Sequence, residues 1–177
     1  MIRFRELLII ILIIIIIIFG VFYIRRLNEL EEESDELQQE VLLYFSSSDA
    51  MYLETEKRIV EENNLYMNTL RELIAGPESS SLQATIPEEV EVKNFSLDGS
   101  LAEVDFNRKL VEEHWGGSTG ERLTVYSIVN TLAQFPEIEK VQILVNGKEL
   151  ETLAGHMDIS GPLEPSKDIV SGEGEEE

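Results

Sequence analysis

The sequence contains no cysteine, and this one absence removes several kinds of chemistry at once. Without thiols the chain has no disulfide, no thiolate zinc site, no cysteine nucleophile and no cysteine to carry a lipid. Histidine is almost as scarce, because His114 and His156 are the only two. Neither stands in a spacing typical of a zinc site, so we expect no metal ion and no cofactor.

Positive charge is also in short supply. Lysine and arginine together number 14 against 35 aspartates and glutamates, which gives a net charge of −21. Proteins that bind nucleic acid neutralise phosphates with lysine and arginine, so we expect no nucleic-acid partner. The same shortage argues against docking on anionic lipid through a basic patch. A basic protein partner or a cation stays open.

One long apolar run is present, from Leu7 to Ile24. As a helix, its 18 residues would extend about 27 Å, close to the thickness of the hydrocarbon core of a bilayer. A cleaved signal peptide would have a shorter apolar region that ends in small residues, whereas bulky residues stand here. We therefore expect a single transmembrane anchor at 7–24. Arginines lie on both sides of it, so the positive-inside rule leaves its orientation open.

The rest of the chain divides by composition. We expect a short cytoplasmic segment at 1–6, an acidic stalk at 25–40, one domain at 41–163 and a disordered acidic tail at 164–177. The stalk has an incomplete helical repeat of leucines, so a short coiled coil is the alternative there.

Apolar periodicity and turn residues predict a small α+β domain of order β-α-β-β-α-β. The predicted elements are a strand at 41–45, a helix at 62–75, strands at 90–97 and 101–106, a helix that ends before Pro136, and strands at 140–145 and 148–153. Asp98-Gly99 and Asn146-Gly147 are typical of tight hairpin turns. In the strand at 101–106, we expect Ala102, Val104 and Phe106 to face the core. The stretch at 52–60 fits either a short strand pair or irregular structure.

The segment 116–120 formally matches the G-x-S-x-G motif of serine hydrolases, with Ser118 at its centre. That motif needs a buried strand directly before the serine, and the sequence Val-Glu-Glu-His-Trp at 111–115 does not provide one. A capping box explains the pattern better, in which Ser118 caps a helix and Glu121 reaches back to it. We therefore expect no catalytic residue. Neighbouring acidic residues argue against an anion site on the glycine-rich turn. Trp115 fits either an exposed recognition residue or a cover over a sheet edge.

Several segments, taken in order, resemble a known family. They are Tyr44-Phe45, Asp49 to Leu53, Arg58, Leu73 to Pro77, Ile86-Pro87, Ala102 to Phe106, Gly116 to Arg122, Tyr126 to Leu132, Val141 to Gly147 and Ile159 to Leu163. Together they resemble GerMN, the sporulation and spore germination domain, over about residues 38–163. The resemblance implies an extracytoplasmic domain tied to a membrane, a fold similar to the ring-building motifs of envelope assemblies, and no known catalytic activity. The sporulation protein of this family has two such domains and a lipidated cysteine, whereas this chain has one domain and the predicted helix.

These observations favour a non-enzymatic, membrane-anchored interaction domain on the outer side of the bacterial cell membrane, with envelope or sporulation proteins as partners. A peptidoglycan-binding module is the alternative, and a cell-wall hydrolase is a weaker one. We expect binding at the Gly116–Arg122 turn with Trp115 and at the segment Asp49–Arg58, since binding residues concentrate in irregular stretches. The candidate binding residues are Arg58, Asp105, Trp115, Gly117, Glu121 and Arg122. Internal ion pairs that fix the loops are the alternative role for Arg58, Asp105 and Arg122.

Overall fold

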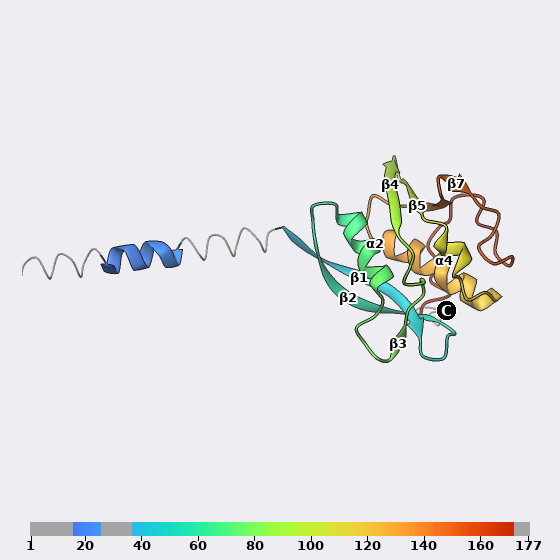
Figure 1. Cartoon of the computed structure of the whole chain (residues 1–177), viewed down its shortest axis with the longest axis horizontal. Coiled ribbons are helices and arrows are strands. Elements are labelled where there is room, and N and C mark those ends of the chain that lie inside the picture. Colours follow the sequence, from blue (N-terminus) through green and yellow to red (C-terminus); the bar gives the residue numbers. More distant parts are fainter. Residues whose placement is uncertain (1–15, 26–36, 172–177) are drawn as a thin grey trace, which may run out of the picture. The chain divides into compact units, whose positions relative to one another are not determined.

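The computed structural model describes residues 16–25 and 37–171 (Figure 1). Residues 16–25 form a helix whose side chains are all exposed, including the apolar ones. The chain divides into two units at residue 38, and each is described by itself. The first half of the predicted anchor, the segment 1–6 and most of the predicted stalk lie outside the described residues. Within the described ranges, no helix is long and apolar enough to cross a membrane.

Two β-sheets form the frame of the domain (Figure 1). The first has the strand order β2-β1-β3, and its strands are β1 (Gln38–Ser47), β2 (Leu53–Glu61) and β3 (Leu82–Gln83). The second has the order β4-β5-β6-β7, with β4 (Val92–Asp98), β5 (Leu101–Phe106), β6 (Lys140–Val145) and β7 (Lys148–Glu149). Strands β5 and β6 are parallel, and the other pairs of this sheet are antiparallel. The helices of the domain are α2 (Leu65–Ala75), α3 (Lys109–Glu112) and α4 (Ser118–Leu132). The fold is thus mixed α+β, as predicted.

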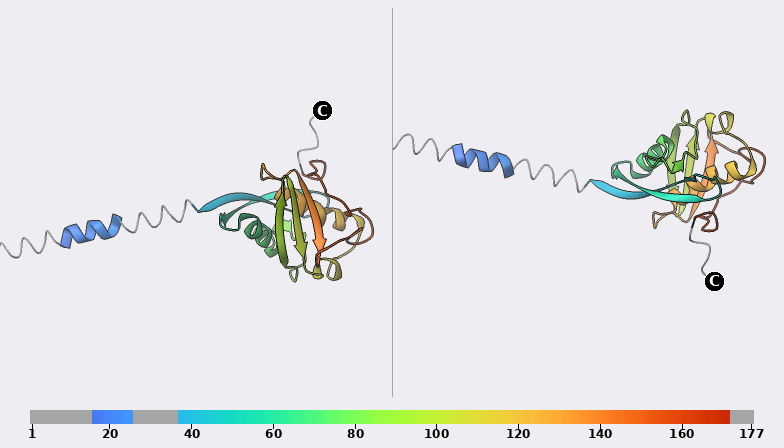
Figure 2. Two further views of the ribbon diagram at one scale, coloured as in Figure 1. Left: turned by 90° about the horizontal axis from the view of Figure 1, so that it is seen from above. Right: turned by 90° about the horizontal axis from the view of Figure 1, so that it is seen from below.

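Helix α4 lies at the centre of the domain, with the two sheets on opposite sides of it (Figure 2). A surface helix has one apolar stripe, but α4 is buried on almost every side and has apolar residues facing both sheets. Beyond the end of α4, the Gln134 side chain accepts a hydrogen bond from Leu42 N at 2.7 Å and donates one to Leu42 O at 2.7 Å. Thr131 accepts another from Tyr44 N at 3.2 Å. These polar side chains cover the edge of β1 that would otherwise lie unpaired inside the protein.

The predicted alternation in β5 is confirmed, because Ala102, Val104 and Phe106 are completely buried in the main core. The turn at Asn146-Gly147 is also confirmed, since both residues have positive φ. The first hairpin differs from the prediction by one residue. Asp98 pairs with Leu101, so the loop consists of Gly99 and Ser100, and only Gly99 has a positive φ.

Other boundaries also differ from the sequence-based expectation. Residues 53–61, which could have been irregular, form the continuous strand β2. Helix α2 begins at Leu65, three residues later than predicted, and ends at Ala75 as predicted, with Gly76 as its C-cap. The predicted last strand is short, because β7 contains only Lys148 and Glu149.

The predicted disordered tail is wrong for residues 164–171, which we call the C-terminal strap. Ile169 and Val170 are buried in a second apolar cluster with Leu53 and Leu123. Leu53 N donates to Ile169 O at 2.7 Å, and Ser171 N donates to Leu53 O at 2.9 Å. Two buried apolar side chains and these backbone bonds hold a segment whose acidic and glycine-rich surroundings suggested disorder. Residues 172–177 lie outside the described residues.

Candidate functional site

An open hollow of about 400 Å³ lies between the β1–β2 turn and the start of α4. We call it the Trp115 hollow. Its lining residues are all uncharged, and they are Ser46, Ala50, Gln83, Ala84, Thr85, Trp115, Gly120, Leu123 and Thr124. Trp115 is the only tryptophan of the chain, and its side chain is 60% exposed. The structure thus brings together the tip of one predicted binding segment, Asp49–Arg58, and the start of the other, Gly116–Arg122 with Trp115.

The β1–β2 turn, residues 48–52, forms one wall of the hollow and is held by its own hydrogen bonds. Ser47 N donates to Tyr52 O at 2.8 Å, and Asp49 Oδ1 accepts from the Ser47 hydroxyl at 2.6 Å and from Met51 N at 3.1 Å. The Ser47 hydroxyl and the Met51 amide hold the pKa of Asp49 below its usual value. Ala50 has a φ of 57°, which is uncommon for a residue with a side chain. This turn presents Met51 and Tyr52 to solvent, 56% and 46% exposed.

His114 lies beside the hollow and connects three of the segments that line it. Gly116 N donates to His114 Nδ1 at 2.9 Å, and His114 Nε2 lies 3.1 Å from the hydroxyl of Thr124 on α4. The Thr124 hydroxyl donates to Thr85 O at 2.6 Å. Burial lowers the pKa of His114, against an opposing effect of the Glu121 carboxylate. The ring is therefore neutral near pH 7.

Thr85 contributes a second polar feature to the hollow. The residue is 2% exposed, and its Oγ1 has no hydrogen-bond partner among the described residues. Buried hydroxyl groups are nearly always hydrogen-bonded, because leaving one unpaired costs about 1–3 kcal/mol. The structure thus leaves one hydroxyl of a lining residue both buried and unpaired among the described residues.

Glu121 does not form the predicted capping box. Gly117 occupies the N-cap position of α4, Ser118 is already its first residue, and none of the described side chains caps the helix. Glu121 is instead completely buried and accepts backbone hydrogen bonds from Leu153, Ala154 and His156, each at 2.8 Å. Burial alone would raise the pKa of Glu121, but these three N–H donors outweigh it and lower the pKa. The role of Glu121 is to fix the 153–156 loop against α4.

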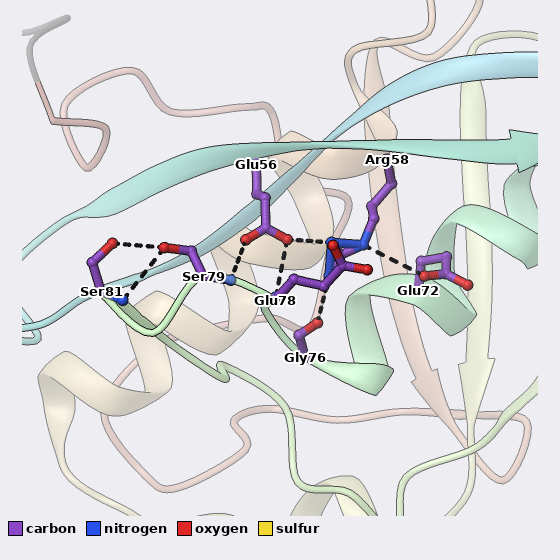
Figure 3. A network of polar contacts seen from close by, with 7 residues as sticks. All are labelled: Glu56, Arg58, Glu72, Gly76, Glu78, Ser79 and Ser81. Carbon is purple, nitrogen blue, oxygen red and sulfur yellow. Dashed lines mark hydrogen bonds and ion pairs between the residues drawn. The ribbon is translucent and has the colours of Figure 1, made fainter.

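Arg58 is the centre of an ion-pair network (Figure 3), and none of the residues in this network lines the Trp115 hollow. Its guanidinium, 9% exposed, pairs with Glu56 and lies 3.7 Å from Glu72 and 3.5 Å from Glu78. It also donates to Gly76 O at 3.1 Å. Glu56 in turn accepts from the backbone N–H groups of Glu78 and Ser79 at 3.1 and 2.9 Å. Arg58 therefore joins β2 to the end of α2 and the loop after it, which matches the structural alternative.

The remaining candidates lie apart from the Trp115 hollow. Asp105 on β5 accepts a hydrogen bond from Gly147 N at 2.8 Å and so supports the β6–β7 turn. Gly117 has a φ of 79° and forms the sharp entry to α4, which is a conformational role. Arg122 is exposed on α4 and lines a different open hollow, of about 450 Å³. Of the six candidate residues, only Trp115 lines the hollow itself.

Ser118, the serine of the rejected hydrolase motif, lines this second hollow. Ser118, His156 and Asp168 all line it, but in the described part of the chain no hydrogen bond connects any two of them. A catalytic serine needs its base within hydrogen-bond reach. Across residues 16–25 and 37–171, no three histidine, aspartate or glutamate residues are placed to hold a metal ion.

Two residues of the site have no recognisable signal in the sequence. Thr85 and His114 were not among the candidates, because a lone threonine and a lone histidine match no motif. Their proximity depends on the packing of three segments against each other, which no local spacing reveals.

Comparison with known proteins gives a family and three similar folds. Residues 42–151 match the family "Germane", described as sporulation and spore germination. A crystal structure of a candidate lipoprotein from Clostridium perfringens is 25% identical with a TM-score of 0.54, over 75% of this chain and 90% of that one. The first GerMN domain of the sporulation protein GerM from Bacillus subtilis is 22% identical with a TM-score of 0.60, over 73% of this chain and 98% of the other.

The tandem GerMN domains of GerM are 19% identical with a TM-score of 0.61. They match 77% of this chain, which spans about half of the tandem (48%). The two GerM matches, below 25% identity, support the fold alone. No curated protein sequence matches this chain.

Proposed function

The chain belongs to the sporulation and spore germination family Germane, with one GerMN-like domain, and from this premise we propose that it is a membrane-anchored interaction domain of the bacterial cell envelope. The helix at 7–24 would anchor it, the domain would lie on the outer side of the membrane, and it would act by contact with other proteins rather than by catalysis. The observation that carries the proposal is the Trp115 hollow.

Three features of the hollow support a binding role. An exposed tryptophan lies over an uncharged depression, and tryptophan is enriched where interfaces concentrate their binding energy. Met51 and Tyr52 add apolar surface on the adjacent turn. Ser46, Gln83 and Thr124 add polar side chains to the lining. Together these provide an apolar anchor and a polar contact, the usual composition of a recognition site.

The anchor and the orientation rest on other observations. The apolar run from Leu7 to Ile24 has the length of a membrane span, and the described part of it is helical with every side chain exposed. The similar Clostridium protein is described as a candidate lipoprotein, which favours attachment to a membrane. Because the arginines around the run are balanced, the outer location depends on the family. Protease protection on intact cells tests it, since a domain that resists added protease until the cells are lysed would be cytoplasmic.

Site-directed photo-crosslinking in the native host tests the interaction. A photoreactive residue at Met51 should crosslink to a specific protein, and the crosslink should disappear in the Trp115→Ala variant. Ile59 is the matched control, because it is 67% exposed on β2 and lies outside the 48–52 turn that forms one wall of the hollow. If Met51 and Ile59 give the same products, or if Trp115→Ala leaves the Met51 product unchanged, the hollow is not the interface.

A second candidate function is glycan binding in the cell wall. The specific observation in its favour is that two aromatic side chains are exposed here, Trp115 on the lining of the uncharged hollow and Tyr52 on the turn that forms one of its walls. The test is co-sedimentation of the full-length protein in detergent with purified peptidoglycan, with and without Trp115→Ala. Sedimentation that depends on Trp115 would favour glycan over protein as the ligand. A protein that stays in the supernatant at low salt removes this candidate.

A further inference from the structure

The geometry points to His114 as the positioning residue of the Trp115 hollow, which holds the hollow in its observed shape only while the imidazole is neutral. The inference adds regulation by pH to the binding site and rests on the proposed function only in treating the hollow as that site.

The first step is that the hydrogen bonds around His114 determine its tautomer. Gly116 N–H can only donate, so Nδ1 must accept, and a nitrogen that accepts carries no proton. At the other end of the relay, the carbonyl oxygen of Thr85 can only accept, so the Thr124 hydroxyl must donate to it. The Thr124 oxygen then accepts from His114 Nε2–H. Taken together, the two ends of the relay therefore require the neutral tautomer with its proton on Nε2.

The second step is what a second proton would do. A protonated imidazole carries N–H groups on both nitrogens, so Nδ1–H would face Gly116 N–H across the present 2.9 Å contact. Two donors cannot share one hydrogen bond. The link between His114 and Gly116 would open, while the Nε2 link to Thr124 could remain. Protonation therefore acts selectively on the loop that carries Trp115.

The third step connects this link to the hollow. Gly116 directly follows Trp115 and has a φ of 77°, a conformation that side-chain-bearing residues rarely adopt. Its bond to His114 ties this turn to α4 through Thr124. Trp115 and Thr124 both line the hollow, and so does Thr85 at the end of the relay. Loss of the Gly116 bond frees the wall that contains Trp115 and leaves the α4 side in place.

The surroundings of His114 set the direction of the pH effect. Among the described residues, the groups that contact the ring are Gly116, Thr124 and Trp115, which do not titrate in this range, and Glu121 on α4 acts on it through its charge. Burial lowers the pKa of His114, and the negative charge of Glu121 opposes this. The net shift is downward, so we expect the hollow to be intact near neutral pH and to open below about pH 6.5, the usual range for histidine.

Trp115 itself is the reporter for the test, because its fluorescence is the only tryptophan signal of the chain. Full-length protein in detergent is titrated from neutral to about pH 5, and acrylamide quenching is measured at each step. Far-UV circular dichroism at the same pH values identifies any global unfolding. The quenching constant should increase through one transition below about pH 6.5 while the secondary structure stays unchanged.

Two variants make the test specific. In His114→Asn, the side-chain oxygen can still accept from Gly116 N–H but does not titrate, so the transition should vanish. In the control His156→Gln, the other histidine is removed and the transition should remain. A transition that persists in His114→Asn, or is lost in His156→Gln, overturns the inference, and so does a wild-type signal that stays flat down to about pH 5. Because this experiment needs no partner, it can succeed even if crosslinking rejects the hollow as the interface.

Discussion

Replacing Glu121 by glutamine separates the role of its charge from that of its shape. The two side chains have nearly the same volume, and Glu121 is completely buried. In the variant, the amide oxygen can keep the bonds from Leu153 and Ala154, which both go to Oε1. The amide nitrogen would take the place of Oε2 and face His156 N–H, so that two donors meet.

The cost follows from these three bonds. A buried N–H left without an acceptor costs about 1–3 kcal/mol, and two bonds that change from a charged to a neutral acceptor lose roughly 0.5–1 kcal/mol each. A neutral amide is cheaper to bury than a carboxylate, which offsets part of this loss. We expect Glu121→Gln to lower the free energy of unfolding by about 2 kcal/mol near pH 7. Urea unfolding of the full-length protein, followed by circular dichroism, measures it.

The pH dependence of the stability difference tests whether the charge of Glu121 is its cause. The folded-state pKa of Glu121 is lowered from 4.5, so its contribution to stability is complete above that value and disappears as the pH falls through the folded-state pKa. The difference between wild type and Glu121→Gln should therefore shrink as the pH falls below 4.5. Other carboxylates titrate there too, but they are the same in both proteins and cancel in the difference. Glu112→Gln is the control, since Glu112 forms an exposed ion pair with Arg108 and should cost less than about 0.5 kcal/mol. A pH-independent difference, or one no larger than that of the control, would refute this account of Glu121.

Three further variants should separate stability from binding. Arg58→Met leaves the Glu56 carboxylate without its guanidinium partner and should lower the free energy of unfolding, measured in urea, by about 3 kcal/mol. The Met51 crosslink should persist in the folded protein. A loss below about 1 kcal/mol would show that the network is not structural. Ile169→Ala removes a buried side chain from the C-terminal strap and should cost about 2–4 kcal/mol by the same assay; an unchanged midpoint would mean that the strap is not docked. Trp115→Ala removes a side chain that is 60% exposed, so it should change stability by less than about 0.5 kcal/mol and yet abolish the Met51 crosslink. A large loss of stability would instead assign Trp115 to the core.

The elements that the sequence predicted well depend on neighbours in the chain. The alternation in β5 places Ala102, Val104 and Phe106 on one face because successive side chains of a strand point to opposite sides. Asn146-Gly147 forms its turn because both residues tolerate positive φ. In each case the physical cause acts within a few residues, so the pattern is visible without the fold.

The features that the sequence could not predict depend on partners far along the chain. The capping box was a sound local hypothesis for Glu121, but the carboxylate has better donors in a loop more than thirty residues later. The strap has few apolar residues, yet Ile169 and Val170 fit a cluster that β2 and α4 leave open. No local rule weighs such alternatives, because their energies depend on the packed structure.

The distribution of charge around the Trp115 hollow supports its role as a recognition surface. The chain has 35 acidic residues, so a random placement of side chains would be expected to put a charge in the lining, yet none of the lining residues is charged. The two acidic residues that lie next to lining residues in the sequence, Asp49 and Glu121, both direct carboxylate oxygens at backbone N–H groups of the protein itself. Their charge thus stabilises the loops around the hollow and is kept out of its lining. A neutral His114 follows the same arrangement, since a charged ring there would break the Gly116 bond. When an uncharged group of a partner binds in the hollow, no charged side chain of the lining has to lose its water. The exposed tryptophan can then contribute most to the binding free energy.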